Sequence, residues 1–175
     1  MDVKKDLRFI CDEITSILRY SESKHAIFVA FNGIAIVNMA NILRSLIAGE
    51  TRPAAIYIMC FTLLCLLLAI CTCMLSYFPR IYENPGNVEQ KDKTNVLFFE
   101  HIKEHTVDSY IKLLCTEYGA NPDEIGSLER CIISQIIVNA KLASRKFRLF
   151  KIAVSFDILA VTAGLGGFIV LQIIR

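Results

Sequence analysis

An uninterrupted apolar block from Ala54 to Phe78 contains no charged residue, and it constrains this chain more than any other feature. A helix needs roughly 20 consecutive apolar residues to cross the hydrocarbon core of a bilayer, and this block is long enough. Pro53 stands directly before it and suits the first position of a helix, because its missing N–H loses no intrahelical hydrogen bond there. The block therefore predicts a transmembrane helix.

Two more apolar blocks, Ala26–Ala48 and Ile152–Ile174, are also long enough to cross a bilayer. The first contains Asn32, Asn38 and Asn41, and we expect these amides to face other helices because lipid offers them no hydrogen bond. The chain is 54% hydrophobic, above the roughly 45–50% that is usual for soluble domains. We therefore expect an all-α integral membrane protein with three transmembrane helices and a helical cytoplasmic segment between the second and the third.

The distribution of charge gives the expected organisation of the chain. Lysines and arginines gather in residues 1–24 and 141–151, and the positive-inside rule places such segments in the cytoplasm. The net charge of +2 is too small to indicate nucleic-acid binding. The expected parts are a cytoplasmic amphipathic helix at 1–24, a transmembrane hairpin at 25–78, a cytoplasmic helical segment at 79–150 and a third transmembrane helix at 151–175.

Apolar residues near the N-terminus recur at alternating spacings of four and three, as in a heptad repeat: Val3, Leu7, Ile10, Ile14 and Ile17. Three interpretations remain open for this helix. It packs on the chain's own cytoplasmic helices, it forms a coiled coil between subunits, or it lies on the membrane surface. Small residues in the third apolar block (Ala160, Gly164 and Gly167) also suit close helix packing, so we expect a homo-oligomer.

The cytoplasmic segment predicts two helices. The first runs from Asn95 to Tyr118, carries an apolar stripe that includes Thr106, and ends at Gly119. The sequence Asn-Pro-Asp-Glu at 121–124 has the form of a capping box and predicts the start of the second. Because no helix breaker follows before the third apolar block, we expect one long helix that enters the membrane.

Few residues suggest chemistry. His101 and His105 stand one helical turn apart, but no third metal ligand is evident, and a solvated helix face is the simpler interpretation. The sequence shows no nucleophile with its base, no glycine-rich phosphate loop, no paired-carboxylate site and no Cys-x-x-Cys pair. We therefore expect no enzyme activity, no cofactor and no metal.

Three stretches carry a family resemblance: SESKHAIFVAFNGIAIV at 21–37, NVLFFEHIKEHTVDSYIKLL at 95–114, and QIIVNAKLASRKFRLFKIAV at 135–154. They resemble the acidic-x-Lys opening, the Phe-Phe…Ile…Tyr segment and the final helix of Pycsar transmembrane effectors. Glu22 departs from the pattern, because an Asp is expected there. No separate β-roll nucleotide-binding domain is present, so a nucleotide site would have to be built from helices.

The resemblance implies an effector of bacterial antiphage defence in the inner membrane. A partner cyclase would supply a cyclic pyrimidine mononucleotide, cyclic CMP or cyclic UMP, and residues 79–150 would sense it. The effector would then impair membrane integrity and cause abortive infection. Two alternatives stay open: a non-signalling membrane assembly or adaptor protein, and an effector that answers a cyclic oligonucleotide.

Two sets of candidate residues follow. For the ligand, aromatic rings would stack on the base and basic side chains would hold the phosphate, although the aromatics could equally be core. This set is Phe98, Phe99, Tyr110, Arg145, Lys146 and Arg148. The second set is a membrane polar layer at similar depth in the three spans, formed by Asn32, Thr72 and Asp157, which we expect to approach one another.

Overall fold

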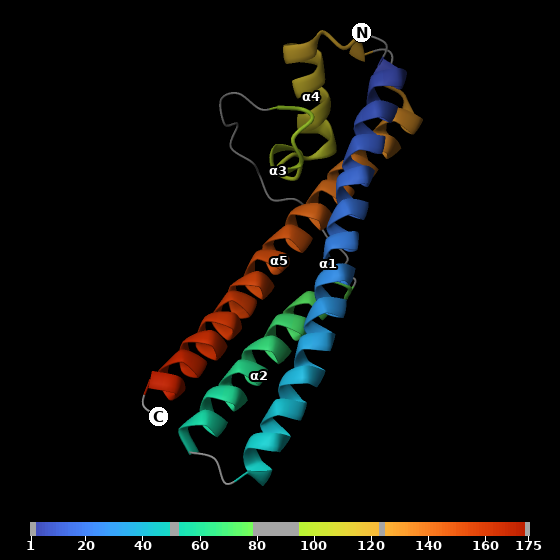
Figure 1. Ribbon diagram of the computed structural model, residues 1–175. Helices are drawn as coiled ribbons and strands as arrows, with labels where there is room; N and C mark the ends of the chain where they lie inside the picture. Colours follow the sequence, from blue (N-terminus) through green and yellow to red (C-terminus); the bar gives the residue numbers. More distant parts are fainter. Residues whose placement is uncertain (1–2, 50–52, 79–94, 123–124, 174–175) are drawn as a thin grey trace. The chain divides into compact units, whose positions relative to one another are not determined.

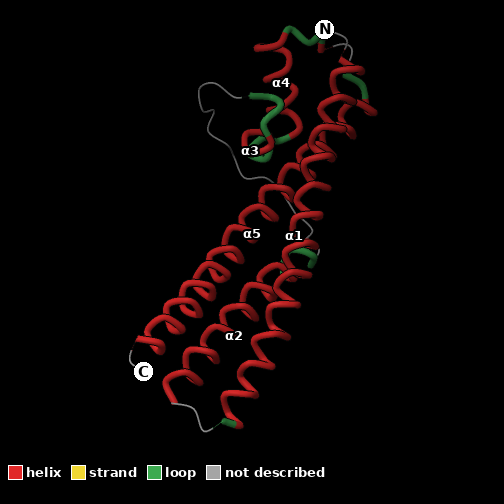
Figure 2. Tube along the Cα trace, viewed as in Figure 1, coloured by secondary structure: helices red, strands yellow, loops and turns green. Residues whose placement is uncertain are grey.

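The computed structural model describes residues 3–49, 53–78, 95–122 and 125–173, and most of these residues are helical (Figure 1). No strand occurs in this part of the chain (Figure 2), so the all-α prediction is confirmed. The helices are α1 (Val3–Ala48), α2 (Pro53–Met74), α3 (Phe99–Ile102), α4 (Val107–Tyr118) and α5 (Ser127–Ile173). The chain divides into two compact units, an aqueous unit (residues 1–22 and 80–147) and a membrane unit (residues 23–79 and 148–175).

The membrane unit contains α2 and the apolar parts of α1 and α5. All three helices are long and apolar enough to cross a membrane, which confirms the three predicted spans. Large apolar side chains such as Ile27, Tyr57 and Ile158 are exposed on its surface, where lipid would cover them. The second span ends at Met74 instead of Phe78, because the N–H groups of residues 76 and 77 turn back to carbonyls three residues earlier.

Small residues let α5 lie close to α2 within the membrane unit. Gly164 faces Thr62, and a Cβ built at Gly167 would lie 2.5 Å from Cγ2 of Ile58. Ala160 is buried in a cluster with Cys65 and Leu66, and three α1 residues (Ala35, Ile36 and Met39) pack against that cluster. The small residues that suggested an oligomer are therefore used inside the chain.

The aqueous unit has its own core. Leu7, Ile10 and Ile14 of α1 are buried against residues of α4 and α5, which include Tyr110 and Ile136. The N-terminal heptad pattern is thus satisfied by packing within the chain, the first of its three interpretations. The helix also continues without a break into the first span, since no glycine or proline separates residues 20 and 26.

The single helix predicted from Asn95 to Tyr118 is wrong, because the structure has two helices there. Thr106 is not part of an apolar stripe but is the N-cap of α4. Its hydroxyl accepts from the N–H of Ser109 at 3.1 Å, and the Ser109 hydroxyl accepts from the N–H of Thr106 at 2.8 Å. This reciprocal capping box starts a new helix. Gly119 ends it as predicted, with a left-handed φ of 66°.

The predicted start of α5 at residues 121–124 is also wrong, and of these Asp123 and Glu124 lie outside the described residues. The helix begins at Ser127, where the carboxylate of Glu129 accepts from the N–H of Gly126 at 3.0 Å. The later carboxylate therefore caps the helix, and Pro122 belongs to the turn that precedes it. From Ser127 to Ile173 α5 is one long helix, as predicted. The sequence Asn-Pro-Gly-Asn at 84–87, which predicts a turn, lies outside the described residues.

Candidate functional site

A partly buried ion pair joins α1 to α5 in the aqueous unit. Nζ of Lys146 donates to Oε1 of Glu22 at 2.5 Å, and the two side chains are 11% and 47% exposed. Seven residues earlier in α5, Asn139 donates to the hydroxyl of Thr15 on α1 at 3.3 Å. Two polar contacts and the apolar core thus hold together the two helices that continue into the membrane unit.

The short helix α3 attaches to another face of α5. The ring of Phe99 packs at a tilt against Phe147, with centroids 5.5 Å apart. Nζ of Lys103 donates to the Ser144 hydroxyl at 3.0 Å and also pairs with Glu100. A basic side chain, a hydroxyl and two aromatic rings therefore gather where α3 meets α5.

An exposed aromatic ring stands at the start of α3. Phe98 is 44% exposed and lies beside Phe99 and edge-on to His101, with ring centroids 5.3 and 5.1 Å away. Nδ1 of His101 accepts from the N–H of Asn95 at 3.0 Å, so this histidine fixes the loop before α3. A half-open aromatic face of this kind can stack on a base.

The second histidine of the pair is structural. His105 is buried, and its Nδ1 lies 3.1 Å from the hydroxyl of Ser109. Burial lowers the pKa of His105 below its ordinary value, and the nearby Glu104 and His101 act on the pKa in opposite directions. The lowered pKa favours the neutral form of the side chain, which supports the start of α4 through its contact with Ser109.

The six candidate ligand residues differ in burial and do not all lie in the same unit. Phe98, Phe99, Arg145 and Lys146 lie in the aqueous unit, with Arg145 half-buried and Lys146 paired to Glu22. Tyr110 is fully buried, and its hydroxyl donates to the carbonyl of Val96 at 2.8 Å. Its ring is therefore a core element in this conformation. Arg148 is exposed and belongs to the membrane unit.

The partners of these residues carry no signal in the sequence. Glu22 stands out there only as a departure from a family pattern, whereas in the structure it forms an ion pair with Lys146. Lys103 and Ser144 belong to no motif, although they connect α3 to α5. Each pair is separated by 41 or more positions, and no periodic pattern links such distant residues.

The membrane unit contains the three residues of the predicted polar layer. Asn32 is fully buried; its Nδ2 donates to the carbonyl of Phe28 at 3.1 Å, while Oδ1 has no hydrogen-bond partner among the described residues. Thr72 is half-buried and donates to the carbonyl of Leu68 at 2.7 Å. Asp157 is half-buried and stands between Ala153 and Ala160, which are both buried. Within the described ranges no hydrogen bond joins these three side chains.

Two of the three asparagines in the first span do not behave as expected within the chain. Asn32 is buried as predicted, but Asn38 and Asn41 are exposed on the surface of α1. Ser76, which sequence reasoning did not select, is buried near the end of the second span, and its hydroxyl has no partner among the described residues. The described part of the membrane unit therefore contains polar groups that its own three helices do not satisfy.

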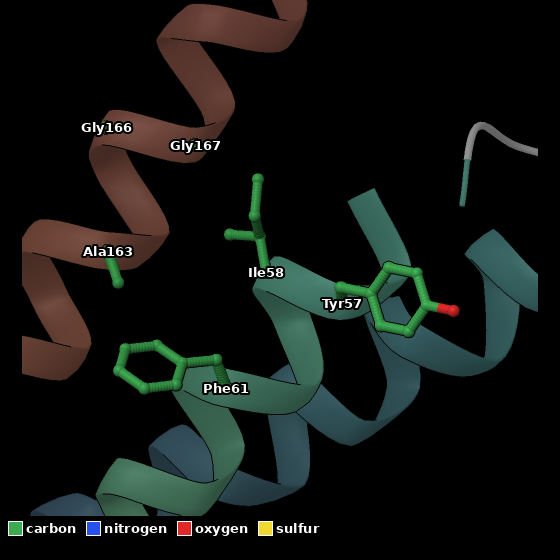
Figure 3. Close-up of a pocket in the computed structure, with 6 residues that line it drawn as sticks. All are labelled: Tyr57, Ile58, Phe61, Ala163, Gly166 and Gly167. Atoms are coloured by element: carbon green, nitrogen blue, oxygen red, sulfur yellow. The ribbon is translucent and has the colours of Figure 1, made fainter. Parts of the chain in front are cut away.

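An apolar groove lies between α2 and α5 (Figure 3). It has a volume of about 420 Å³ and is lined by Tyr57, Ile58, Phe61, Ala163, Gly166 and Gly167. Ile58 points from α2 toward Gly167, whereas the ring of Tyr57 points away from α5. The lining is almost entirely apolar carbon, which suits an acyl chain and offers nothing to hold a nucleotide.

The fold and these sites define a class: a multi-pass helical membrane protein whose spans continue into a small aqueous helical unit. Residues 6–174 match the Pycsar effector protein domain, PycTM, which is nearly the whole chain. The chain therefore belongs to the Pycsar effector family and is a membrane effector of antiphage defence, not a member of a known enzyme family. No curated protein and no solved structure matches the chain.

Proposed function

We propose that a cyclic pyrimidine mononucleotide, cyclic CMP or cyclic UMP, activates this effector and that activation impairs the bacterial inner membrane. A nucleotide cyclase would make the ligand on infection, and loss of membrane integrity would then cause abortive infection. The observation that carries the proposal is the family match over residues 6–174, together with an aqueous unit whose α1 and α5 both continue into spans.

The aqueous unit offers groups of the required chemistry. Lys146 and Arg145 would hold the cyclic phosphate, because cationic donors bind phosphate oxygens with short, strong hydrogen bonds. Phe98 and Phe99 would stack on the pyrimidine ring, and Phe98 is the more exposed of the two. Tyr110 would support this surface from the core, and Arg148 would add positive charge at the start of the membrane unit.

The ion pair suggests how binding could be transmitted. A phosphate that binds Lys146 competes with the carboxylate of Glu22, so binding would release α1 from α5 at this point. Because both helices continue unbroken into the membrane unit, a change in their packing would reach the spans. Removal of the Glu22 charge should therefore sensitise the effector to ligand, and removal of Lys146 should abolish the response.

The polar layer is the proposed output element. Ala35 and Ile36 of α1 pack against the cluster that contains Ala160, and Asn32 and Asp157 each precede these residues by about one turn. This register supports the proposal that the two side chains approach one another, with Thr72 near the same depth. If the Asp157 charge serves an ion path, Asp157→Asn should abolish depolarisation but leave folding and ligand binding intact. If the layer only packs, Asp157→Asn should behave like the wild type and Asp157→Leu should impair assembly.

Direct binding tests the proposal. The purified full-length protein in detergent should be stabilised against heat by cyclic CMP or cyclic UMP, and Arg145→Ala and Lys146→Ala should each reduce the stabilisation. Lys112→Ala is the matched control, because Lys112 is exposed on α4. Unchanged affinity in both variants would reject the assigned phosphate site. Stabilisation only by a cyclic dinucleotide would support the alternative ligand, and stabilisation by neither class would support a non-signalling assembly protein.

A further inference from the structure

One face of the membrane-spanning part of α1 has two side-chain amides, Asn38 and Asn41, with no hydrogen-bond partner among the described residues. Asn38, Asn41 and Ser45 are exposed and follow one another at spacings of three and four, so they form a stripe along one side of the helix. Asn32, which is buried against the chain's own helices, lies on the opposite side. The same outer side is apolar nearer the aqueous unit, where Phe31 and Ile34 are also exposed.

Asn38 and Asn41 lie inside the hydrocarbon region. The ring of His25 contacts Tyr77, with centroids 6.3 Å apart, and tyrosine is typical of the membrane interface. Asn38 stands thirteen residues further along α1, which is about 20 Å at 1.5 Å per residue. Asn41 lies about 24 Å from His25 by the same rise, within a hydrocarbon core of about 30 Å.

Other exposed polar side chains on the spans form hydrogen bonds within their own helix, whereas the amides of Asn38 and Asn41 do not in the described part of the chain. The hydroxyls of Ser155 and Thr162 donate to carbonyls of their own helix at 3.0 and 2.9 Å. Ser45 does the same, toward the carbonyl of Asn41 at 3.1 Å. The side-chain amides of Asn38 and Asn41 bond to nothing in the described part of the chain, and lipid tails cannot supply a partner.

We propose that copies of this chain associate through the outer face of α1, with Asn38 and Asn41 of one copy hydrogen-bonded to the same residues of the next. A second copy fits this face because a carboxamide carries both donor and acceptor and is therefore self-complementary. It also fits because identical faces brought together by a symmetry axis place like residues opposite one another. The groove between α2 and α5 is lined almost wholly by carbon and offers the amides little.

The association itself is independent of ligand. Only its use in damaging the membrane rests on the proposed function. In an assembly of more than two copies, the stripes would face the common axis and line it with amides and hydroxyls. Such a lining would hydrate more readily than the leucine-rich faces of α2, which remain toward lipid.

The test compares the oligomeric state of full-length variants in nanodiscs and mild detergent by mass photometry and by energy transfer between labelled copies. Asn38→Leu/Asn41→Leu should weaken association roughly tenfold or more, since each copy loses two interhelical hydrogen bonds. Asn38→Gln/Asn41→Gln keeps the amides and should restore most of it. Thr162→Leu is the control, because that exposed hydroxyl is satisfied within its own helix.

The leucine substitutions make the span more apolar, so membrane insertion should persist and a loss of oligomers cannot be ascribed to failed insertion. An unchanged oligomer in Asn38→Leu/Asn41→Leu, or a monomeric wild-type protein, would overturn the proposal. If association weakens as expected while the wild-type protein never responds to a cyclic mononucleotide, the proposed function fails and the interface stands.

Discussion

We predict that removing Glu22 and removing Lys146 from their ion pair will lower the free energy of unfolding by different amounts. Lys146 is nearly buried, whereas the Glu22 side chain is 47% exposed. Glu22→Gln removes the carboxylate from a nearly buried ammonium, while Lys146→Met leaves a carboxylate that water can reach. We expect Glu22→Gln to lower the free energy of unfolding by about 1–2 kcal/mol and Lys146→Met by about 1 kcal/mol or less.

The coupling between the two substitutions gives the strength of the pair. A charge-assisted hydrogen bond contributes about 1.5–3 kcal/mol, and the exposure of Glu22 reduces this toward about 1 kcal/mol. A double-mutant cycle by thermal unfolding in detergent measures this coupling. Lys112→Met and Glu117→Gln, both on the exposed side of α4, are the matched controls and should be near neutral. A coupling below about 0.3 kcal/mol, or a larger loss for Lys146→Met than for Glu22→Gln, would refute the reasoning.

Three further predictions concern packing, capping and pH. Gly167→Ala should destabilise the membrane unit by about 1–3 kcal/mol, because the new methyl group would overlap Ile58, and the melting temperature should fall. Thr106→Ala should cost about 1 kcal/mol of unfolding free energy through loss of the α4 cap, seen by circular dichroism. Because burial lowers the pKa of His105, the unfolded chain binds its proton more readily, so stability should be full above about pH 6.5 and fall as the pH drops below that value.

Each of these has a control within the chain. Gly166→Ala should be tolerated, since nothing lies within 4 Å of its added methyl group, and equal effects at Gly166 and Gly167 would contradict the packing account. Thr116→Ala removes only a hydroxyl that bonds back to its own exposed helix, and it should be near neutral. His105→Gln should reduce the loss of unfolding free energy between pH 6.5 and 5. If the pH dependence is the same in this variant as in the wild type, His105 is not its cause.

The long elements of the fold could be predicted from the sequence because each depends on a local pattern. The span α2 follows from a long apolar block without charge, although its end at Met74 did not, and the unbroken α5 follows from the absence of a helix breaker. Local capping was harder to predict. Asn121–Glu124 has the letters of a capping box, yet Glu129 caps α5 from inside the helix, and Thr106 caps a helix in the middle of a periodic stretch.

The candidate sites could be predicted only in part, because they depend on which faces meet. Periodicity placed Leu7 and Ile14 on one face but could not choose between the chain's own core and a partner. Composition flagged Asn32, Asn38 and Asn41 equally, and only the structure separates the buried amide from the two exposed ones. The partner of Lys146 was not predictable, since residues separated by 124 positions share no local signal.

Ion flow through a defined bilayer tests the central claim most directly. The full-length protein is reconstituted in liposomes that hold a potassium diffusion potential, and a voltage-sensitive dye reports the potential as cyclic UMP or cyclic CMP is added. We expect one of these ligands to collapse the potential with the wild-type protein, and we expect Lys146→Ala to insert normally but to leave the potential intact. A potential that persists with wild-type protein under both ligands, or that collapses equally with Lys146→Ala, would contradict the claim.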